Sequence, residues 1–468
     1  MKKLLLLAAA GMIASSAMAV TDGCTYQSVN GFTCKNQWVD DRVSNLSGWN
    51  ALPFASMPAK ARTATLWDDA QGKTKVVVGF SKTITEGESS DDYATLVFID
   101  IITGAVEKEV QMTLNGEPIK GQLCANQVGC DGFNNLWFAG FMASMLKMDG
   151  DNNVSGSNEL KIFKVDNVET GACSLAAALT LPEDDWSADN QGRVDYCDVC
   201  GDITLKQGPC TVIAAPASGG CVVYGWGAAQ NGTWGPKMNG GDYGVGRIDE
   251  TYPAGQTSWG TAPTAYIVRD EEFTGEMFYV DGFTTCPALY TTDGSMIGSF
   301  GEATDLAPKV GTNGVSEFTL AGKPFIVYSM DQYGGTPPCQ ISVCELGEGS
   351  SFEGMQRYWT LPENGLGDVS DGGTRYHGIG VRHYPDASDK DGIYLVTYKC
   401  NNGLGVYAIG EAGWQDPNSA GVADMEVADE NAAVEYFNLQ GVAVDEDNLT
   451  PGLYITRQGS KTSKKVVK

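Results

Sequence analysis

The residues best suited to acid–base chemistry lie together in one late segment, Asp371–Tyr384. The sequence has only two histidines, His377 and His383, and this segment contains both of them together with Arg375. A histidine titrates near neutral pH, so an enzyme that uses an imidazole as its general base must use one of these two. If Tyr376–Val381 is the inner strand of a sheet, Arg375 and His377 are two residues apart and face the same side. Hydrogen bonding at the surface is the alternative interpretation of this segment.

Acidic residues are the second group with catalytic chemistry. Glycoside hydrolysis needs two carboxyl groups that face each other across a sugar, and their separation is decided by the fold and not by sequence spacing. The candidates that we select first are Asp195, in a cysteine-rich segment with Asp198 and Asp202, and Asp281. The sequence contains no G-x-S-x-G, H-E-x-x-H or P-loop motif, so serine esterase, zincin and nucleotide hydrolase activities have no support.

Tryptophans are the candidates for ligand binding, and the chain has ten of them. Trp226, Trp234 and Trp259 lie in the glycine-rich segments YGWGAAQ, NGTWGP and TSWGT, where we expect exposed loops. Aromatic faces in open loops stack on sugar rings, and neighbouring amides and carboxylates bind the sugar hydroxyls. The three tryptophans therefore predict a glycan-binding region, with packing inside the core as the alternative for each one.

One acidic loop has part of a calcium-binding pattern. Asp149, Asp151 and Asn153 place oxygen side chains at alternating positions, as in an EF-hand loop. The pattern fails at Val154, where the sharp turn requires Gly, and at Leu160, where the bidentate Glu is required. We therefore predict a polar hairpin without metal and no cofactor, and a Ca²⁺ site is the alternative.

The chain has thirteen cysteines, which in an exported protein imply disulfide bonds, and the odd number leaves at least one cysteine unpaired or paired between chains. Their spacing suggests two local disulfides, Cys124 with Cys130 and Cys339 with Cys344. A four-thiolate zinc site is the alternative for a second group, because structural zinc sites favour a short Cys-x-x-Cys step. That group comprises Cys197, Cys200, Cys210 and Cys221.

The elements that must position these residues are predicted to be β-strands almost throughout. Glycine is frequent, prolines occur in turns, and the apolar runs are short and rich in β-branched and aromatic residues, as in Lys75–Phe80 and Gly392–Tyr398. We find no amphipathic helix of more than about three turns. The sequence therefore predicts an all-β fold.

A repeated pattern orders these strands: an apolar strand ending in Asp, a turn with Gly, and a return strand. Copies or partial copies begin at Leu96–Asp100, Leu160–Asp166, Ala288–Asp293, Gln340–Glu345 and Leu404–Ile409. The pattern is typical of the outer hairpin of a β-propeller blade, which must pack on its neighbours to bury its faces. We predict a β-propeller of about six blades, with five or seven as near alternatives and a pair of β-sandwich domains as the other fold.

The first nineteen residues are typical of a secretory signal peptide. They combine Lys2 and Lys3 with the apolar run Leu4–Ala10 and end in the small-residue site Ala17-Met18-Ala19. No later run approaches the length of apolar sequence that a membrane helix needs. We therefore expect secretion and no membrane span.

The remaining chain divides into three parts. The strand pattern covers 20–410, and the polar segment 411–431, rich in Gly, Ala and Asp, is typical of a linker. Residues 432–468 are expected to form a small C-terminal β module, in which polar turns separate three apolar strands. The expected strands are Val434–Leu439, Gly452–Thr456 and Lys464–Val467.

The C-terminal module resembles the sorting module of proteins exported by the type IX (Por) secretion system of Bacteroidetes. The resemblance rests on the aromatic-N-L-x-G-x-x-V entry after Val434, on Pro451-Gly452-x-Tyr454 and on the Lys464–Lys468 ending. It implies that the module contacts the export machinery and that the protein reaches the extracellular space or outer-membrane surface of a Gram-negative bacterium. The body more loosely resembles uncharacterised secreted Bacteroidetes proteins with propeller-like bodies.

Charge and composition limit the classes of partner that we expect the protein to bind. The formal net charge is −27, and the only basic cluster is Lys461–Lys468. Nucleic acids and anionic lipids are bound through clustered Lys and Arg, so we expect neither as a partner. The first hypothesis is a secreted or cell-surface, non-catalytic protein that binds a glycan or protein through aromatic loops. The alternative is a propeller-type glycan hydrolase or lyase that uses a carboxylate pair, and a structural role in the cell envelope is the third.

Overall fold

The structure is a computed structural model, and its chain forms two compact units, Met1–Trp414 and Gln415–Lys468. The structure describes residues 25–41, 49–55, 60–86, 89–121, 123–140, 146–148, 154–156, 159–180, 194–216, 222–236, 245–247, 264–269, 275–282, 285–300, 306, 312–330, 339–367, 377–384, 390–418, 434–437, 443–444, 449, 452–458 and 461–467. The expected signal peptide, residues 1–19, lies outside this set.

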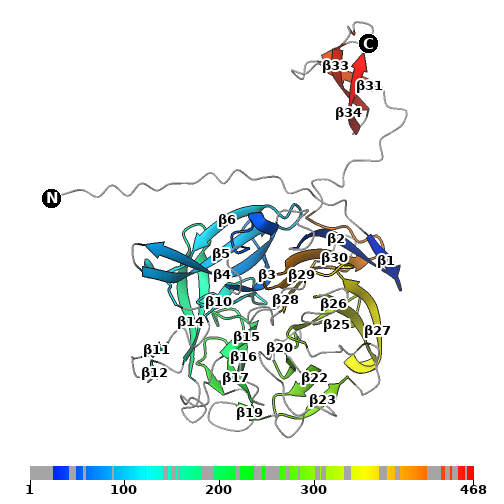
Figure 1. Ribbon diagram of the computed structural model, residues 1–468. Coiled ribbons are helices and arrows are strands. Elements are labelled where there is room, and N and C mark those ends of the chain that lie inside the picture. Colours follow the sequence, from blue (N-terminus) through cyan, green and yellow to red (C-terminus); the bar gives the residue numbers. More distant parts are fainter. Residues whose placement is uncertain are drawn as a thin grey trace, which may run out of the picture. The chain divides into compact units, whose positions relative to one another are not determined.

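The first unit is a β-propeller of six blades around a central axis (Figure 1). Blade 1 comprises, from inner to outer strand, β3 (Ala61–Asp68), β4 (Thr74–Glu86), β5 (Ser89–Asp100) and β6 (Val106–Gln111). Blade 2 comprises β9 (Gln127–Cys130), β10 (Leu136–Ala139), β13 (Glu159–Asn167) and β14 (Ala172–Thr180), and is extended by β7 (Thr113–Leu114) and β8 (Glu117–Pro118). Blade 3 comprises β15 (Val194–Gly201), β16 (Cys210–Pro216) and β17 (Val222–Ala228), and β17 pairs with both β18 (Gly235–Pro236) and β19 (Val245–Arg247). A hairpin of β11 (Leu146–Met148) and β12 (Val154–Gly156) and the short helix η1 (Trp49–Ala51) accompany them.

Blades 4 to 6 complete the ring. Blade 4 comprises β20 (Thr264–Ile267), β21 (Met277–Gly282), β22 (Thr285–Thr291) and β23 (Met296–Ser299). Blade 5 comprises β24 (Val315–Leu320), β25 (Lys323–Ser329), β26 (Ile341–Gly347) and β27 (Ser351–Leu361), with the short helix η4 (Glu348–Ser350). Blade 6 comprises β28 (His377–His383), β29 (Gly392–Lys399), β30 (Gly403–Glu411), β2 (Phe32–Asp41) and β1 (Thr25–Val29). The predicted β-propeller of about six blades is confirmed, and the pair of β-sandwich domains is wrong.

The two ends of the propeller sequence close the ring in blade 6. Strand β2 pairs antiparallel with β30, in a register that runs from Phe32 opposite Glu411 to Asp41 opposite Gly403. The six inner strands β3, β9, β15, β20, β24 and β28 contact one another in turn around the axis. Beyond β30, Trp414 packs against the core, so the body reaches a few residues past the expected boundary at 410.

The apolar core lies between the blades, and this explains the strand sequences. Strand β29 is buried at every position, because blades 1 and 5 cover its two faces. An apolar strand covered on both faces reads as a continuous apolar run. The outer strand β6 of blade 1 instead has only half-buried and exposed residues, since no further strand pairs with its outer edge.

The predicted Asp–Gly turns form the outer hairpins. Between β5 and β6, Asp100 Oδ1 accepts hydrogen bonds from the backbone N–H groups of Ile102 and Thr103, and Gly104 follows with φ +68°. The side chain of Asp or Asn mimics a backbone turn in this way, and Gly adopts positive φ without a steric cost. Asn167 and Asp293 accept equivalent bonds in the hairpins β13–β14 and β22–β23.

The C-terminal unit is a small β-sheet of its own. Its four strands pair in the order β32-β31-β33-β34, with the bounds β31 (Val434–Phe437), β32 (Ala443–Val444), β33 (Gly452–Gln458) and β34 (Lys461–Val467). The three expected strands are present, and β32 is an addition that the sequence pattern did not predict. Among the described residues, no helix has the length and apolar character to cross a bilayer.

Candidate functional site

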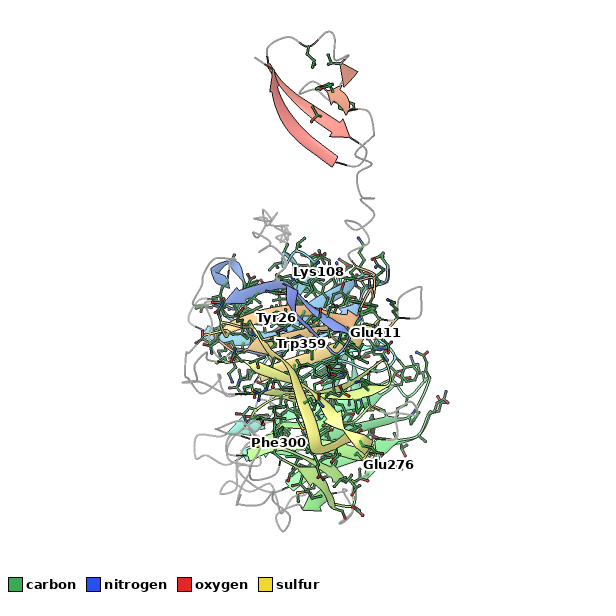
Figure 2. The ribbon with its side chains drawn as sticks, turned by 90° about the vertical axis from the view of Figure 1, so that its right-hand side faces the viewer. Tyr26, Lys108, Glu276, Phe300, Trp359 and Glu411 are labelled. Atoms are coloured by element: carbon green, nitrogen blue, oxygen red, sulfur yellow. The ribbon has the colours of Figure 1, made fainter. Side chains whose placement is uncertain are left out.

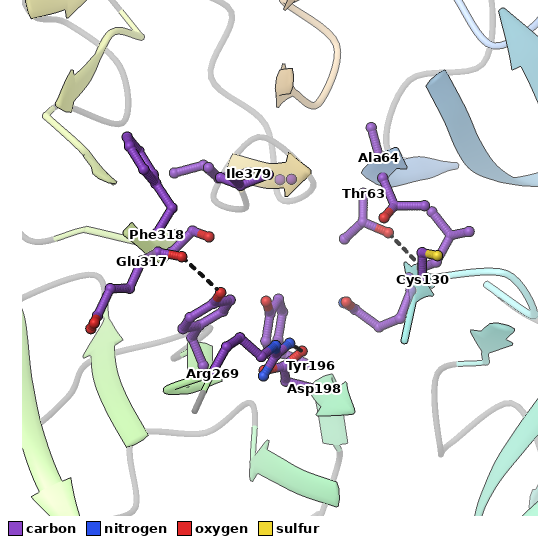
Figure 3. A pocket seen from close by; sticks show the side chains of 18 of the residues that line it. Thr63, Ala64, Cys130, Tyr196, Asp198, Arg269, Glu317, Phe318 and Ile379 are labelled. Atoms are coloured by element: carbon purple, nitrogen blue, oxygen red, sulfur yellow. Dashed lines mark hydrogen bonds and ion pairs between the residues drawn. The ribbon is translucent and has the colours of Figure 1, made fainter. Parts of the chain in front are cut away.

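The central channel of the propeller is the site with the most varied chemistry. It is a cavity of about 660 Å³, and all six inner strands contribute to its wall (Figure 3). Because each inner strand comes from a different blade, the wall brings together residues that are distant in sequence. The described side chains with polar chemistry there include Tyr196, Asp198, Tyr266, Arg269 and Glu317.

Asp198 and Arg269 form an ion pair in this wall. Arg269 Nη2 donates to Asp198 Oδ1 at 2.7 Å, and Asp198 Oδ2 accepts the backbone N–H of Ile267 at 2.8 Å. Burial lowers the pKa of Arg269, but Asp198 outweighs it and the pKa is raised well above its ordinary value. Arg269 also lies over the ring of Tyr266, 4.6 Å from its centroid. The pair therefore joins blades 3 and 4 and carries a fixed positive charge beside an aromatic face.

Two tyrosines next to this pair supply neutral hydroxyl groups. Burial, together with the charge of Asp198, raises the pKa of Tyr196 well above its ordinary value of 10.0. Burial also raises the pKa of Tyr266, whose hydroxyl donates to the backbone oxygen of Glu317 at 3.1 Å. A neutral phenol both donates and accepts hydrogen bonds. Tyr196 thus adds a half-buried ring and a neutral hydroxyl to the channel wall, whereas the Tyr266 ring is only 9% exposed and lies under Arg269.

Cys130 lines the cavity from β9 and lies across it from Glu317 and Phe318, as Figure 3 shows. Arg382 Nη1 donates to its Sγ at 3.2 Å, and Arg382 Nε and Nη2 donate to Asp68 Oδ2 at 2.8 and 2.7 Å. Burial raises the pKa of Cys130 to about 12. A thiol with such a pKa is protonated at neutral pH, so Cys130 is no thiolate nucleophile in this structure.

The two predicted catalytic carboxylates lie inside the protein. Asp195 is buried at the start of β15, and its Oδ2 lies 3.8 Å from Arg62 Nη1. Asp281 is fully buried; its Oδ2 accepts the N–H of Gly314 at 2.9 Å, its Oδ1 accepts the Thr264 hydroxyl, and burial raises its pKa. Neither residue belongs to the channel wall. Asp281 joins the neighbouring blades 4 and 5, whereas Asp195 of blade 3 faces Arg62 of blade 1, and the structure does not bring the two carboxylates to a common site.

The two histidines lie at opposite ends of β28. His383 lines the channel, and its Nε2 is 3.0 Å from Asp391 Oδ1. His377 begins the strand, six residues earlier, which corresponds to about 20 Å of extended chain. Arg375 and the side chain of His377 lie outside the described residues, so the proposed pair of these two is not placed.

The tryptophans differ from the expected exposed cluster. Trp226 is only 4% exposed, because its side chain packs between blades 2 and 3, where it stacks with Tyr224 at 6.2 Å. Trp234 is half-buried and packs against the same core cluster. The expected exposure of Trp226 is therefore wrong, and Trp259 lies outside the described residues.

The geometry of the strands decides which core cluster each cysteine packs into. Cys197 packs in the core between blades 2 and 3, whereas Cys200 packs between blades 3 and 4, since residues three apart in a strand face opposite sides. This separates the proposed zinc ligands. Cys124 and Cys130 are thiols and form no local disulfide, and Cys344 is a thiol, so the pair with Cys339 is absent as well.

No metal centre is formed within the part of the chain that the structure describes. No three His, Cys, Asp or Glu side chains gather there closely enough to hold an ion. The candidate calcium ligands Asp149, Asp151 and Asn153 lie outside the described residues.

No sequence pattern marked the channel residues Tyr196, Tyr266 and Arg269 as a site. Asp198 and Arg269 are 71 residues apart, and no spacing rule connects positions on different blades. The one available indication was that Tyr196 and Asp198 flank Cys197 on a predicted strand, next to the selected Asp195.

Comparison with known proteins gives distant structural similarities and no family. No protein-family model and no curated protein sequence matches the chain. Similar solved structures include a subtype N11 neuraminidase-like protein of A/flat-faced bat/Peru/033/2010 (H18N11), with 12% identity and TM-score 0.35 over 78% of this chain and 93% of that chain. Another is the alpha-L-arabinofuranosidase from Lactobacillus brevis, with 8% identity and TM-score 0.31 over 75% and 92%. At these identities and scores, neither bears on the activity of this chain.

Proposed function

We propose that this protein is a secreted, non-catalytic binding protein that holds a glycan at the central channel of its propeller. The observation that carries this proposal is the composition of the channel wall. Tyr196 and Tyr266 supply aromatic side chains with neutral hydroxyls around a cavity of about 660 Å³, next to the charged pair of Asp198 and Arg269, and Arg269 itself lies over the Tyr266 ring. Aromatic faces combined with a few fixed polar groups are suited to sugar rings and their hydroxyls.

The hydrogen bonds that Asp198 and Asp281 already accept within the protein favour binding over hydrolysis. Asp198 accepts bonds from Arg269 and Ile267, and Asp281 accepts bonds from Thr264 and Gly314. Hydrolysis of a glycosidic bond needs two carboxyl groups that both reach the sugar. Among the described residues that line the channel, Asp198 and Glu317 are the only carboxylates, and Asp198 is already paired.

Secretion and surface location are part of the same proposal. Residues 1–19 supply the export signal, and the C-terminal module would contact the export machinery that its sequence resembles. The acidic body, with a net charge of −27 for the whole chain, is suited to neutral ligands and unsuited to nucleic acid.

A glycan array probed with the full chain, followed by mass spectrometry of each bound sugar, tests the proposal. We expect intact glycans to be retained, and we expect Tyr196→Phe and Arg269→Gln to weaken retention. Lys161→Gln is the matched control, because Lys161 lies in blade 2 and pairs only loosely with Glu159 at 3.9 Å.

Two results would overturn the proposal. A shortened sugar would identify a glycan hydrolase or lyase, and Asp198→Asn and Glu317→Gln would then be compared for loss of turnover. Retention that is unchanged in both channel variants would show that the channel is not the binding site.

A further inference from the structure

A second cavity, of about 570 Å³, lies between blades 1 and 2, and the proposed function does not use it. We call it the inter-blade groove. Its wall comes from the β3–β4 turn, the ends of β5 and β13, the start of β6 and the β9–β10 turn. Figure 1 shows these two blades as neighbours around the ring. The groove and the central channel have no lining residue in common, so an inference about the groove is independent of the channel proposal.

The floor of the inter-blade groove is aromatic and fixed in place. Trp67 and Phe98 line it and pack edge to face, with ring centroids 5.9 Å apart and an angle of 69° between the rings. The indole Nε1 of Trp67 donates to the backbone oxygen of Asn134 at 3.3 Å, which ties its orientation to blade 2. Trp67 is half-buried, so part of its surface remains accessible. An indole held in this way loses little conformational entropy when a ligand stacks on it.

The turn between β9 and β10 makes the groove rigid. Asn134 has φ +64°. Its Nδ2 donates to the backbone oxygen of Asp68 at 2.9 Å, and its Oδ1 accepts the backbone N–H of Asp68 at 3.2 Å. Asp131 Oδ1 accepts the N–H groups of Phe133 and Asn135, both at 2.9 Å. The two blades are therefore connected at the groove by hydrogen bonds between the Asn134 side chain and the Asp68 backbone, and the shape of the groove exists without a ligand.

The rim of the groove carries charges that are paired. Lys75 Nζ lies 2.6 Å from Glu107 Oε1, and Lys164 Nζ lies 2.9 Å from Asp166 Oδ1. Lys108 Nζ binds Glu169 Oε1 and also lies 5.6 Å from the centroid of the Phe98 ring. Each lysine of the groove wall thus has a carboxylate partner, so phosphate or nucleic acid would have to displace that partner first.

Such pairs match the chemistry of sugar hydroxyls. Each pair offers an N–H donor next to a carboxylate acceptor, and each hydroxyl group of a sugar both donates and accepts. The aromatic floor supplies the stacking surface for the apolar face of the ring. From these features together, we infer that the inter-blade groove is a second carbohydrate site, which binds a neutral oligosaccharide with one sugar ring on Trp67.

Isothermal titration calorimetry of the full chain with cellohexaose, xylohexaose and mannohexaose tests this inference. We expect at least one of these neutral probes to bind, and we expect Trp67→Ala to weaken its binding by about tenfold or more. Trp67→Phe, which keeps an aromatic face, should retain most of the affinity. Inorganic phosphate at the same concentration should not compete.

A second variant guards against loss of folding, since Trp67 also packs against the core. Lys108→Gln combined with Glu169→Gln removes one exposed pair of the rim and should leave the melting temperature nearly unchanged. It should still weaken binding severalfold. The inference is wrong if no neutral probe binds, if phosphate binds in preference, or if Trp67→Ala and the double variant both bind as the unchanged chain does.

The channel variant Tyr196→Phe separates the two proposals. Binding that is weakened by Trp67→Ala but not by Tyr196→Phe assigns the probe to the groove, whatever the fate of the channel proposal. The opposite pattern overturns the groove site and leaves the channel site standing.

Discussion

The central channel and the inter-blade groove are lined by charged pairs of two different kinds. In the channel, Asp198 binds both the side chain of Arg269 and the backbone of Ile267, and it is only 7% exposed. In the groove, Lys108 and Glu169 contact each other at the surface, and the Glu169 side chain is 74% exposed. A buried charge that loses its partner is costly, whereas an exposed pair contributes little to stability. The channel pair therefore holds the blades together, and the partly exposed groove pairs of Lys108 and Lys164 remain available for a ligand.

The same contrast recurs elsewhere in the propeller, whose side chains are drawn as sticks in Figure 2. Lys323 and Glu345, on the neighbouring strands β25 and β26, form another partly exposed pair at 2.9 Å, with the Lys323 side chain 42% exposed. Asp281, in contrast, is fully buried between blades 4 and 5 and is surrounded by hydrogen-bond donors. Depth of burial thus distinguishes structural carboxylates from those that are free to meet a ligand.

The largest expected effect comes from breaking the channel pair. Asp198→Ala should lower the free energy of unfolding by about 3 kcal/mol, because Arg269 and the Ile267 N–H lose their acceptor in the wall of the cavity. Asp198→Asn should cost less, since it keeps one acceptor. Urea denaturation measures both. Asp166→Ala, from the groove, is the control, and an equal loss in this control would contradict the proposed difference between the two regions.

A second prediction concerns Arg382, which contacts both regions. It binds Asp68, which lines the groove, and Cys130, which lines the channel. Arg382→Ala should cost about 2 kcal/mol of stability, because two charge-assisted hydrogen bonds to Asp68 are lost. Arg382→Lys should recover only part of it, since a lysine ammonium cannot reproduce the planar guanidinium that directs two N–H groups at Asp68 Oδ2 and a third at Cys130. Full recovery by lysine, measured by urea denaturation, would contradict the assigned geometry.

A third prediction compares the pH dependence of two glutamates of blade 5. Burial raises the pKa of Glu317 above its ordinary value of 4.5, so its contribution to stability is present below pH 4.5 and is lost as pH rises through the raised pKa. For Glu345, burial is outweighed by the Tyr358 hydroxyl and Lys323, and the pKa is lowered. Its contribution is present above pH 4.5 and is lost as pH falls through the lowered pKa.

Glutamine variants therefore have opposite effects on the melting curve. Glu317→Gln should remove a loss of stability between acidic and neutral pH, whereas Glu345→Gln should remove a gain. Melting temperatures recorded from pH 3 to pH 8 by circular dichroism, at about equal ionic strength, give both slopes. Changes of the same sign in the two variants would show that the two carboxyls do not differ as described.

The smallest stability effect is expected in the groove. Lys164→Ala should change the free energy of unfolding by less than about 0.5 kcal/mol, because its pair with Asp166 is partly exposed and screened by salt. Thermal melting at low and high salt measures it. A loss above about 1 kcal/mol would place this pair with the structural pairs of the channel instead.

Local patterns in the sequence were sufficient to predict much of the fold. The Asp100 and Gly104 turn predicted its hairpin because Asp closes the turn with its own side chain and Gly accepts positive φ. The four-stranded C-terminal sheet was predicted in part; the short β32 was missed because two residues carry no recognisable pattern. These are interactions between residues that are near each other in the chain.

The site was predicted poorly for a physical reason. Trp226 in a glycine-rich segment reads as a loop residue, but pairing of β17 with β16 and β18 turns it into the core between two blades. Asp195 and Asp281 were selected for their chemistry, and the packing of neighbouring blades buried both. Burial of a side chain depends on which blade covers it, and that information is absent from the local sequence.

The sequence by itself determined the all-β class, the outer hairpins and the acidic character, because these depend on backbone propensity, turn chemistry and composition. Only the tertiary structure decided which inner strands meet around the channel and which charges end up paired. Asp198 meets Arg269, and Trp67 meets Asn134, because consecutive blades pack side by side around the axis. Contacts between blades join residues that are far apart in sequence, and only the packing of the blades brings them within bonding distance.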